Sequence, residues 1–222
     1  NTFGIDVNAS EFVSVDSIQD LKDVLNTNPS DLLILGGGSN MLLTKDVNAL
    51  VLQINLKGIS VISSTENSVQ VKVSAGENWH ELVCWCLKEN FGGLENLSLI
   101  PGNVGTAPIQ NIGAYGVELK DSFISCEALD IQTKELRVFT KEDCKFGYRN
   151  SIFKQELKGQ YIITSVVFEL SSQEHSLKTN YGAIETKLQN YGIQTPTIQD
   201  VSKAVISIRN SKLPDPKKIG NS

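Results

Sequence analysis

Residues 96–116 contain no Asp, Glu, Lys or Arg, although 20 % of the 222-residue chain is charged. A membrane-spanning helix needs roughly 20 predominantly apolar residues, and this stretch is instead rich in Gly, Asn, Gln and Pro. Pro101 and Pro108 break the apolar pattern further. We therefore predict no membrane span here. The stretch is called the uncharged loop below.

The segment before the uncharged loop predicts a β-α-β unit and then a change of pattern. "EFVSV" reads as a strand, residues 17–27 as an amphipathic helix with Ser17 as N-cap, and "LLILG" as a short strand buried on both faces. "ALVLQI" extends this unit. Residues 69–75 then alternate between apolar and polar side chains, which predicts an antiparallel strand, and "NWHELVCWCLKENF" reads as a helix.

Beyond the uncharged loop, "SCEALDI", "ELRVFT" and "YIITSVVFEL" are strand candidates, and two helices follow His175, the second with Thr197 as N-cap. Pro214 and Pro216 are expected to end that helix. We predict an α+β fold with two lobes, residues 1–56 and 57–172, and the start of a further domain at residues 173–222.

The amino-acid composition limits the classes of molecule that this chain is expected to bind. A net charge of −5 and a pI near 5.1 argue against nucleic acid and acidic membrane surfaces, so a small molecule is expected. The four cysteines lack disulfide spacing and predict buried thiols in a reducing cytoplasm. His80 and Cys84 lie one helical turn apart, but zinc needs three or four ligands, so no metal is predicted. The chain starts at Asn1 without Met, which suggests a fragment.

"ILGGGSN" places three glycines, Gly36, Gly37 and Gly38, with Ser39 and Asn40 directly after a predicted strand. Backbone N–H groups at such a turn can converge on an anion such as phosphate. The dinucleotide fingerprint is not met, because position 41 is Met rather than Gly. The residues are compatible both with a phosphate-binding turn and with a tight turn that binds no ligand.

The uncharged loop combines glycines with neutral hydrogen-bonding side chains, and its relevant residues are Gly102, Gly105, Thr106, Gln110, Asn111, Gly113, Ala114 and Gly116. Glycine lets a backbone press against a ligand, and amides supply donors and acceptors without charge. A flavin ring would suit such a wall, because its N3–H and carbonyls need neutral partners. The alternative is an ordered loop that satisfies its own backbone.

Three cations are candidate ligand-binding residues. Arg149 lies among Phe146, Tyr148 and Phe153, and an Arg held between aromatic faces suits a two-point grip on a carboxylate. Surface stacking is the alternative. Arg209 and Lys212 end the last predicted helix, where they either bind phosphate or carboxylate or complement the helix dipole.

A family resemblance covers the chain from Asn1 to Ser222. "NTFGI", "ILGGGSN", "AGENWHELV", "GLENLSLIPGNVGTAPIQNIGAYGVEL", "FGYRNSIF" and "SKLPDP", in this order, resemble the UDP-N-acetylenolpyruvoylglucosamine reductases, also called UDP-N-acetylmuramate dehydrogenases. The resemblance implies a two-lobed FAD-binding domain of the vanillyl-alcohol-oxidase (PCMH) type. It also implies non-covalent FAD, NADPH as co-substrate, and reduction of the enolpyruvyl sugar to UDP-N-acetylmuramate for peptidoglycan, by a cytoplasmic monomer.

The resemblance also assigns roles to residues. Arg149 would be catalytic, binding the substrate carboxylate, and Tyr181 and Lys212 would bind substrate. The cofactor-binding residues would be Gly36, Gly37, Gly38, Ser39, Asn40, Gly102, Gly105, Thr106, Gln110, Asn111, Gly113, Ala114 and, near the phosphates, Arg209.

The end of the chain departs from the family pattern. The family continues into a Gly-Asn-x-Gly-Ser-Phe-Phe stretch whose Ser donates a proton, and later supplies a catalytic Glu. Here Gly220 and Asn221 match that stretch, and Ser222 falls short of the proton donor. We therefore expect a truncated chain that binds FAD but turns over poorly or not at all. The alternatives are an FAD-linked oxidase of the same fold and a non-catalytic nucleotide-sugar binding module.

Overall fold

Three parallel strands form a small sheet in the computed structural model, which describes residues 3–213. They are β1 (Ala9–Val15), β2 (Leu32–Leu35) and β3 (Val47–Ile54), in the order β1-β3-β2. Helix α1 (Ile18–Asn26) connects β1 to β2, and the Ser17 side chain accepts a hydrogen bond from the Asp20 N–H at 3.0 Å as its N-cap. The predicted β-α-β unit and its cap are confirmed.

The prediction that "LLILG" is buried on both faces was wrong. All four residues of β2 are only half-buried. The reason is that β2 is an edge strand of this sheet, and its residue Ile34 borders a cavity that is described below.

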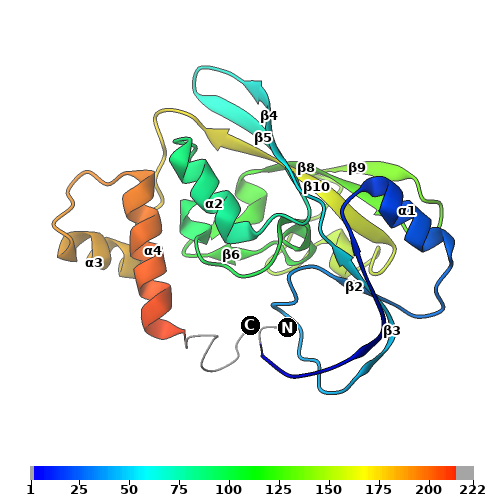
Figure 1. Ribbon diagram of the computed structural model, residues 1–222. Coiled ribbons are helices and arrows are strands. Elements are labelled where there is room, and N and C mark those ends of the chain that lie inside the picture. Colours follow the sequence, from blue (N-terminus) through cyan, green and yellow to red (C-terminus); the bar gives the residue numbers. More distant parts are fainter. Residues whose placement is uncertain (1–2, 214–222) are drawn as a thin grey trace.

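A five-stranded antiparallel sheet forms the centre of the molecule (Figure 1). Its strands are β4 (Ile59–Ser64), β5 (Ser68–Ser74), β10 (Tyr161–Ser171), β8 (Phe123–Asp130) and β9 (Leu136–Thr140), in that spatial order. The sequence predicted all of them except β4. This strand lies at the edge of the sheet with five of its six residues exposed, so it lacks the apolar alternation that identifies a half-buried strand.

Helix α2 (Trp79–Lys88) and the uncharged loop pack on one face of the five-stranded sheet. The Trp79 ring meets the edge of Phe168 of β10 with centroids 6.0 Å apart. Trp79, Leu82, Val83 and Cys86 are buried as the helical pattern predicted, whereas Leu87 is half-buried. Burial raises the pKa of the Cys86 thiol to about 12, so this thiol is unreactive.

One of the four cysteines is not buried, although burial was predicted for all four. Cys86, Cys126 and Cys144 are buried, but Cys84 is exposed on α2. The helical period explains the difference, because Cys84 and Cys86 are two residues apart and therefore point to different sides of the helix. All four are free thiols.

Short turns shape the uncharged loop into an ordered segment. The 3-10 helix η1 (Glu95–Leu97) overlaps its start, and it contains the 3-10 helices η2 (Val104–Thr106) and η3 (Pro108–Gln110). Strand β6 (Gly113–Ala114) lies near its end and pairs with β7 (Val117–Glu118), which follows it. Two further 3-10 turns are η4 (Leu119–Asp121) and η5 (Ile152–Lys154). The uncharged loop is thus ordered without being a regular helix or sheet, and no described helix is long and apolar enough to cross a membrane.

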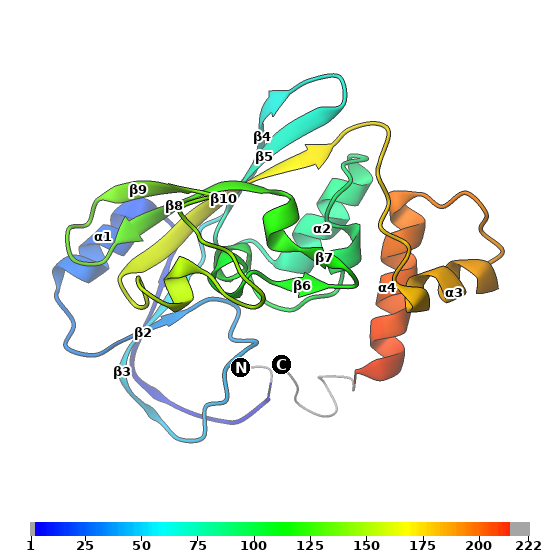
Figure 2. The same ribbon diagram turned by 180° about the vertical axis from the view of Figure 1, so that it is seen from behind.

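Helices α3 (Gly182–Asn190) and α4 (Ile198–Lys212) lie at the opposite end of the molecule from α1, as both views show (Figures 1 and 2). Thr197 caps α4 as predicted, and it exchanges hydrogen bonds with Asp200 in a capping box. Pro214 and Pro216 lie outside the described residues, so their expected effect on the end of α4 stays a prediction.

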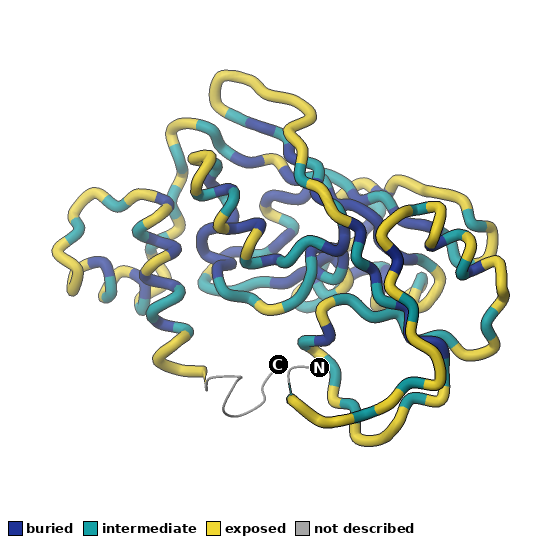
Figure 3. Tube along the Cα trace, in the orientation of Figure 1, coloured by how far each residue is buried: buried dark blue, intermediate teal, exposed yellow. Residues whose placement is uncertain are grey.

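Buried residues form three clusters, which appear as dark segments of the chain in Figure 3. The largest joins α2, the uncharged loop and the five-stranded sheet, and the smallest joins α3 and α4. The second lies around α1 but also includes Ala75, Leu129 and Ile162, which belong to the predicted second lobe. The division at residues 1–56, 57–172 and 173–222 stays a prediction.

Candidate FAD-binding site

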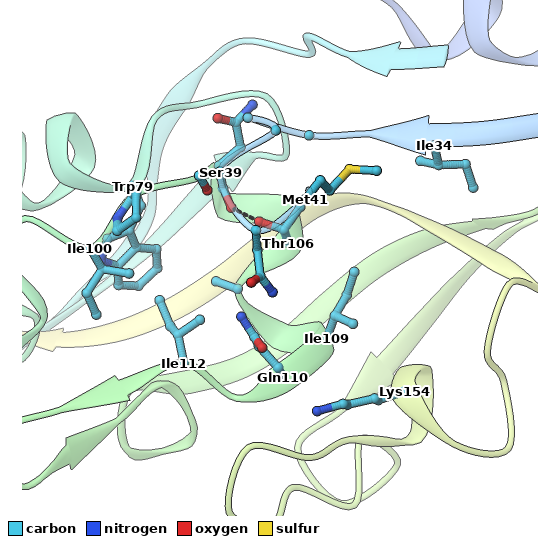
Figure 4. A pocket seen from close by; sticks show the side chains of 17 residues that line it. Ile34, Ser39, Met41, Trp79, Ile100, Thr106, Ile109, Gln110, Ile112 and Lys154 are labelled. Atoms are coloured by element: carbon cyan, nitrogen blue, oxygen red, sulfur yellow. Dashed lines mark hydrogen bonds between the residues drawn. The ribbon is translucent and has the colours of Figure 1, made fainter. Parts of the chain in front are cut away.

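Two segments that are far apart in the sequence enclose a cavity of about 430 Å³ (Figure 4). One is the glycine-rich turn, residues 36–41, directly after β2; the other is the part of the uncharged loop between Ile100 and Ile112. Trp79 also lines it, and Lys154 is the one charged side chain among the described lining residues. The sequence predicted both segments, but not that they face one another across one cavity.

Glycine is required where the two segments touch. A Cβ atom on Gly36 would lie 2.5 Å from the Thr106 Cγ2, and one on Gly37 would lie 2.9 Å from the Asn103 Oδ1 and 3.1 Å from the Gly102 Cα. Gly38 has a φ of +66°, a conformation that side chains disfavour. The glycines therefore serve close packing and a tight turn, and the same residues line the cavity.

A second, mostly apolar cavity of about 240 Å³ adjoins the first. Ile34, Gly36, Thr106 and Ile109 line both cavities. Gly105 lines only the second, where its backbone N–H donates to the Ala75 carbonyl at 2.9 Å. Apolar walls next to a neutral polar cavity suit a ligand with both a flat ring and a polar chain.

The two neighbouring amides of the uncharged loop do different things. Gln110 lines the first cavity, as predicted for a cofactor-binding residue. Asn111 is fully buried elsewhere: its Nδ2 donates to the Gly147 carbonyl at 3.0 Å, and its Oδ1 accepts from the Lys120 N–H at 3.1 Å. Its amide thus holds the protein's own backbone, which is the alternative that the sequence left open.

Gly113 and Ala114 form β6 and do not line either cavity. A Cβ atom on Gly113 would lie 2.9 Å from Nη1 of Arg149. Arg149 in turn donates a hydrogen bond from Nη2 to the Gly113 carbonyl. Gly113 therefore makes room for an arginine side chain.

Of the two alternatives for Arg149, the structure shows stacking at the surface rather than enclosure by three aromatic rings. Its guanidinium lies over the Tyr148 ring alone, 5.4 Å from the centroid. Phe146 and Phe153 pack instead on the edges of other phenylalanines, at centroid distances of 4.9 and 5.0 Å. The more hydrophobic Phe rings enter the core, whereas Tyr148 stays 84 % exposed. Arg149 itself has a φ of +52°.

The same segment of the uncharged loop also meets Tyr181 and Arg209. The rings of Tyr115 and Tyr181 meet edge to face with centroids 5.5 Å apart. The Tyr115 hydroxyl and the Arg209 guanidinium also interact electrostatically. Burial lowers the pKa of Arg209 and raises that of Tyr115, and the Nε of Arg209 is buried without a hydrogen-bond partner. Residues 113–116 therefore gather Arg149, Tyr181 and Arg209, whereas Lys212 is exposed in the last turn of α4.

His80 is a further residue whose position the sequence did not predict. Its Nδ1 accepts a hydrogen bond from the Leu99 N–H at 3.1 Å, in a turn where Leu99 has a φ of +61°. Burial lowers the pKa of His80, and Arg209 lowers it further, against an opposing effect of Glu81. Among residues 3–213, no group of three or more potential metal ligands occurs.

Comparison with known proteins identifies the family. The family described as "FAD binding domain" matches residues 10–138, which is more than half of the chain and includes both segments that enclose the cavity. The chain belongs to the FAD-binding domain family. The mostly uncharged lining, the close glycine contacts and the adjoining, mostly apolar cavity fit this cofactor, since FAD joins a flat ring system to a polar chain.

Curated relatives confirm the resemblance seen in the motifs. The chain is 56 % identical over 223 residues to the UDP-N-acetylenolpyruvoylglucosamine reductase of Flavobacterium johnsoniae, and 50 % identical over 224 residues to that of Pseudomonas fluorescens. Both alignments cover all of this chain and 66 % of the relative. The chain thus spans slightly less than two thirds of the length of these relatives.

Solved structures of two other proteins show a similar fold. A UDP-N-acetylenolpyruvylglucosamine reductase from Thermus caldophilus aligns with a TM-score of 0.71 at 23 % identity, covering 97 % of this chain and 68 % of that one. A solvent-stable cholesterol oxidase aligns with a TM-score of 0.56 at 15 % identity, over 78 % of this chain and 36 % of that one. At these identities the likeness concerns the fold. The predicted α+β fold with an FAD-binding domain is confirmed.

Proposed function

We propose that this chain is the FAD-binding part of a UDP-N-acetylenolpyruvoylglucosamine reductase, which uses NADPH to form UDP-N-acetylmuramate for peptidoglycan. The observation that carries the proposal is the position of residues 113–116. This short segment continues the cavity-lining loop and contacts Arg149 through Gly113, and Tyr181 and Arg209 through Tyr115. A cofactor wall and a set of candidate substrate ligands therefore belong to one continuous segment.

In this proposal, the glycine-rich turn and the uncharged loop hold the cofactor. Gly36, Gly37, Gly38, Ser39, Asn40, Thr106 and Gln110 line the first cavity, and Gly105 lines the second. Neutral groups bind a flavin without fixing a charge beside it. When bound, FAD supplies hydride transfer between NADPH and the substrate.

Asn111, Gly113 and Ala114 support the site from behind. Asn111 and Gly113 are bonded to residues 147 and 149, and they determine where Arg149 lies. Gly102 supports the glycine-rich turn in the same way, since a Cβ atom on it would lie 3.1 Å from the Ser39 Oγ. Gly102 then acts on the cofactor through the glycine-rich turn, whereas Asn111 and Gly113 act through Arg149.

Arg149 would hold the carboxylate of the enolpyruvyl group. Addition of hydride to the double bond pushes electron density toward this carboxylate, and a fixed guanidinium stabilises the developing charge. The Tyr148 ring covers one face of the Arg149 guanidinium, and the hydrogen bond to the Gly113 carbonyl fixes the direction of the guanidinium. Arg149 therefore both binds the substrate and assists the reaction.

Tyr181 and Lys212 would bind the nucleotide sugar, and Arg209 would lie near the phosphates of the cofactor or the substrate. The buried Arg209 Nε has no hydrogen-bond partner among residues 3–213, which supports a ligand anion near Tyr115. Lys212 lies one turn further along α4 and is free to reach a phosphate from the surface. The enzyme would act in the cytoplasm as a monomer.

The proposal is tested on the 222-residue chain itself. Added FAD should bind with quenching of its fluorescence, and the enolpyruvyl sugar should then shift the flavin absorption spectrum, whereas Arg149→Lys should weaken this shift without changing FAD binding. A chain that binds FAD, ignores the sugar and produces peroxide steadily with NADPH would instead be an oxidase. Binding of UDP without any flavin would indicate a nucleotide-sugar binding module.

A further inference from the structure

Two asparagines of the uncharged loop are completely enclosed by protein. Asn96 is 1 % exposed and Asn111 is 0 % exposed, although each carries an amide that needs hydrogen-bond partners. Neither lines the cofactor cavities. Their partners show what they do instead.

Asn96 connects the uncharged loop to the segment that carries Tyr181. Its Nδ2 donates to the Tyr115 carbonyl at 3.0 Å and to the Lys178 carbonyl at 2.8 Å. The second bond joins residues 82 positions apart, and Lys178 lies three residues before Tyr181. One NH₂ group therefore fixes the backbone on both sides of the contact between the Tyr115 and Tyr181 rings.

The chemistry of this position is specific to a group with two donors. Both partners of the Asn96 Nδ2 are carbonyl oxygens, and an NH₂ group has two N–H donors for them. The other atom of the amide, Oδ1, is buried without a partner. A carboxylate here would direct negative charge at two acceptors, and a hydroxyl would satisfy only one.

Asn111 makes the corresponding connection to the segment that carries Arg149. Its Nδ2 bonds the Gly147 carbonyl at 3.0 Å, two residues before Arg149. Asn111 has a φ of +43°, a conformation in which Asn is among the favoured residues. Ser151 adds a bond from its Oγ to the Ile109 carbonyl at 2.7 Å on the other side of Arg149.

We propose that Asn96 and Asn111 are positioning residues, each of which attaches one ligand-facing segment to the cofactor-binding loop. Asn96 holds residues 176–182 and so places Tyr181, and Asn111 holds residues 144–151 and so places Arg149. The uncharged loop then determines the positions of both Tyr181 and Arg149. The attachment of the two segments follows from these hydrogen bonds alone. Its role in binding a substrate rests on the function proposed above.

The test compares hydrogen–deuterium exchange in the FAD-loaded 222-residue chain with Asn96→Asp and Asn111→Asp variants, each serving as the matched control of the other. Loss of one buried hydrogen bond should speed exchange about tenfold in the attached segment. Asn96→Asp should do so in residues 176–182 and Asn111→Asp in residues 144–151, with little change in the other segment. Thr164→Val removes a buried donor in β10, outside both segments, and should affect neither.

Other outcomes overturn the proposal. Equal acceleration of both segments in either variant, or acceleration throughout the chain, would mean that the asparagines only support the fold. If Asn96→Asp does not fold, Asn96→Ser is measured instead, since it keeps one donor, and unchanged exchange in residues 176–182 would refute the role. Failure of the proposed reductase activity would leave the exchange result intact, so the two proposals are tested separately.

Discussion

The contact between Gly36 and Thr106 gives the sharpest prediction. In Gly36→Ala, the new Cβ would lie 2.5 Å from the Thr106 Cγ2, while the next two contacts, at 3.9 and 4.0 Å, are ordinary. The two carbons would have to separate by about 1 Å to reach normal contact. Thr106 is not free to rotate away, because its Oγ1 donates to the Asn103 carbonyl at 2.7 Å.

Overpacking of this kind costs about 1–3 kcal/mol. A loss of about 2 kcal/mol would lower the Tm by about 4–8 °C in a chain of this size. Thr106→Ser removes only the methyl group and keeps the hydroxyl, so it should cost less than about 1 kcal/mol on its own. The double variant Gly36→Ala, Thr106→Ser should recover most of the lost stability, because the clashing atom is gone.

The free energies of unfolding of all four proteins, measured in urea, give the coupling energy of the cycle. We expect a coupling of at least about 1 kcal/mol in favour of the double variant. FAD affinity should follow the same order, since Gly36 and Thr106 both line the cavity. Additive effects, or a Gly36→Ala variant as stable as the parent, would refute the close approach of the two segments.

Three further changes test the surroundings of the site. His80→Asn keeps an acceptor for the Leu99 N–H. Because the pKa of His80 is lowered in the folded protein, the parent protein should lose stability as the pH falls below 6.5. Thermal unfolding measured against pH should show a smaller loss of stability in the variant. Arg209→Met should raise stability slightly by removing a buried charge with an unpartnered Nε, yet weaken binding of UDP measured by calorimetry; unchanged UDP binding would contradict the phosphate role. In the full-length protein, Arg149→Lys should lower turnover of the enolpyruvyl sugar more than tenfold, roughly the loss of a bidentate contact, with FAD affinity unchanged; equal losses in both would exclude the carboxylate role.

Much of the fold followed from local patterns in the sequence. The capped helix after Ser17, the alternation at residues 69–75 and the cap at Thr197 each depend on neighbours a few residues away, and all are present in the structure. Strand β4 was missed because an exposed edge strand has no buried side to mark it. The half-burial of β2 could not be predicted, since it depends on where the strand lies in the sheet.

The site was predictable in its composition and not in its contacts. Neutral, glycine-rich residues indicated a flavin wall, and Gln110 does line the cavity. Asn111, one residue later, turns into the protein because Gly147 is there to accept its hydrogen bond, a partner 36 positions away. Arg149 likewise meets Gly113 and Tyr148 rather than the phenylalanines beside it in the sequence. Long-range pairing of this kind leaves no periodic signal.

The shared core around α1 has a consequence for how the cofactor enters and leaves. Leu21 and Leu25 of α1 belong to one buried cluster with Leu129 of β8 and Ile162 of β10, so the apolar core around α1 is shared with the five-stranded sheet. The walls of the cavity are therefore joined at this end, and separating them would expose that cluster to water. We therefore expect FAD exchange to depend on local opening of residues 36–41 or 100–112 rather than on separation of the two sides of this shared core.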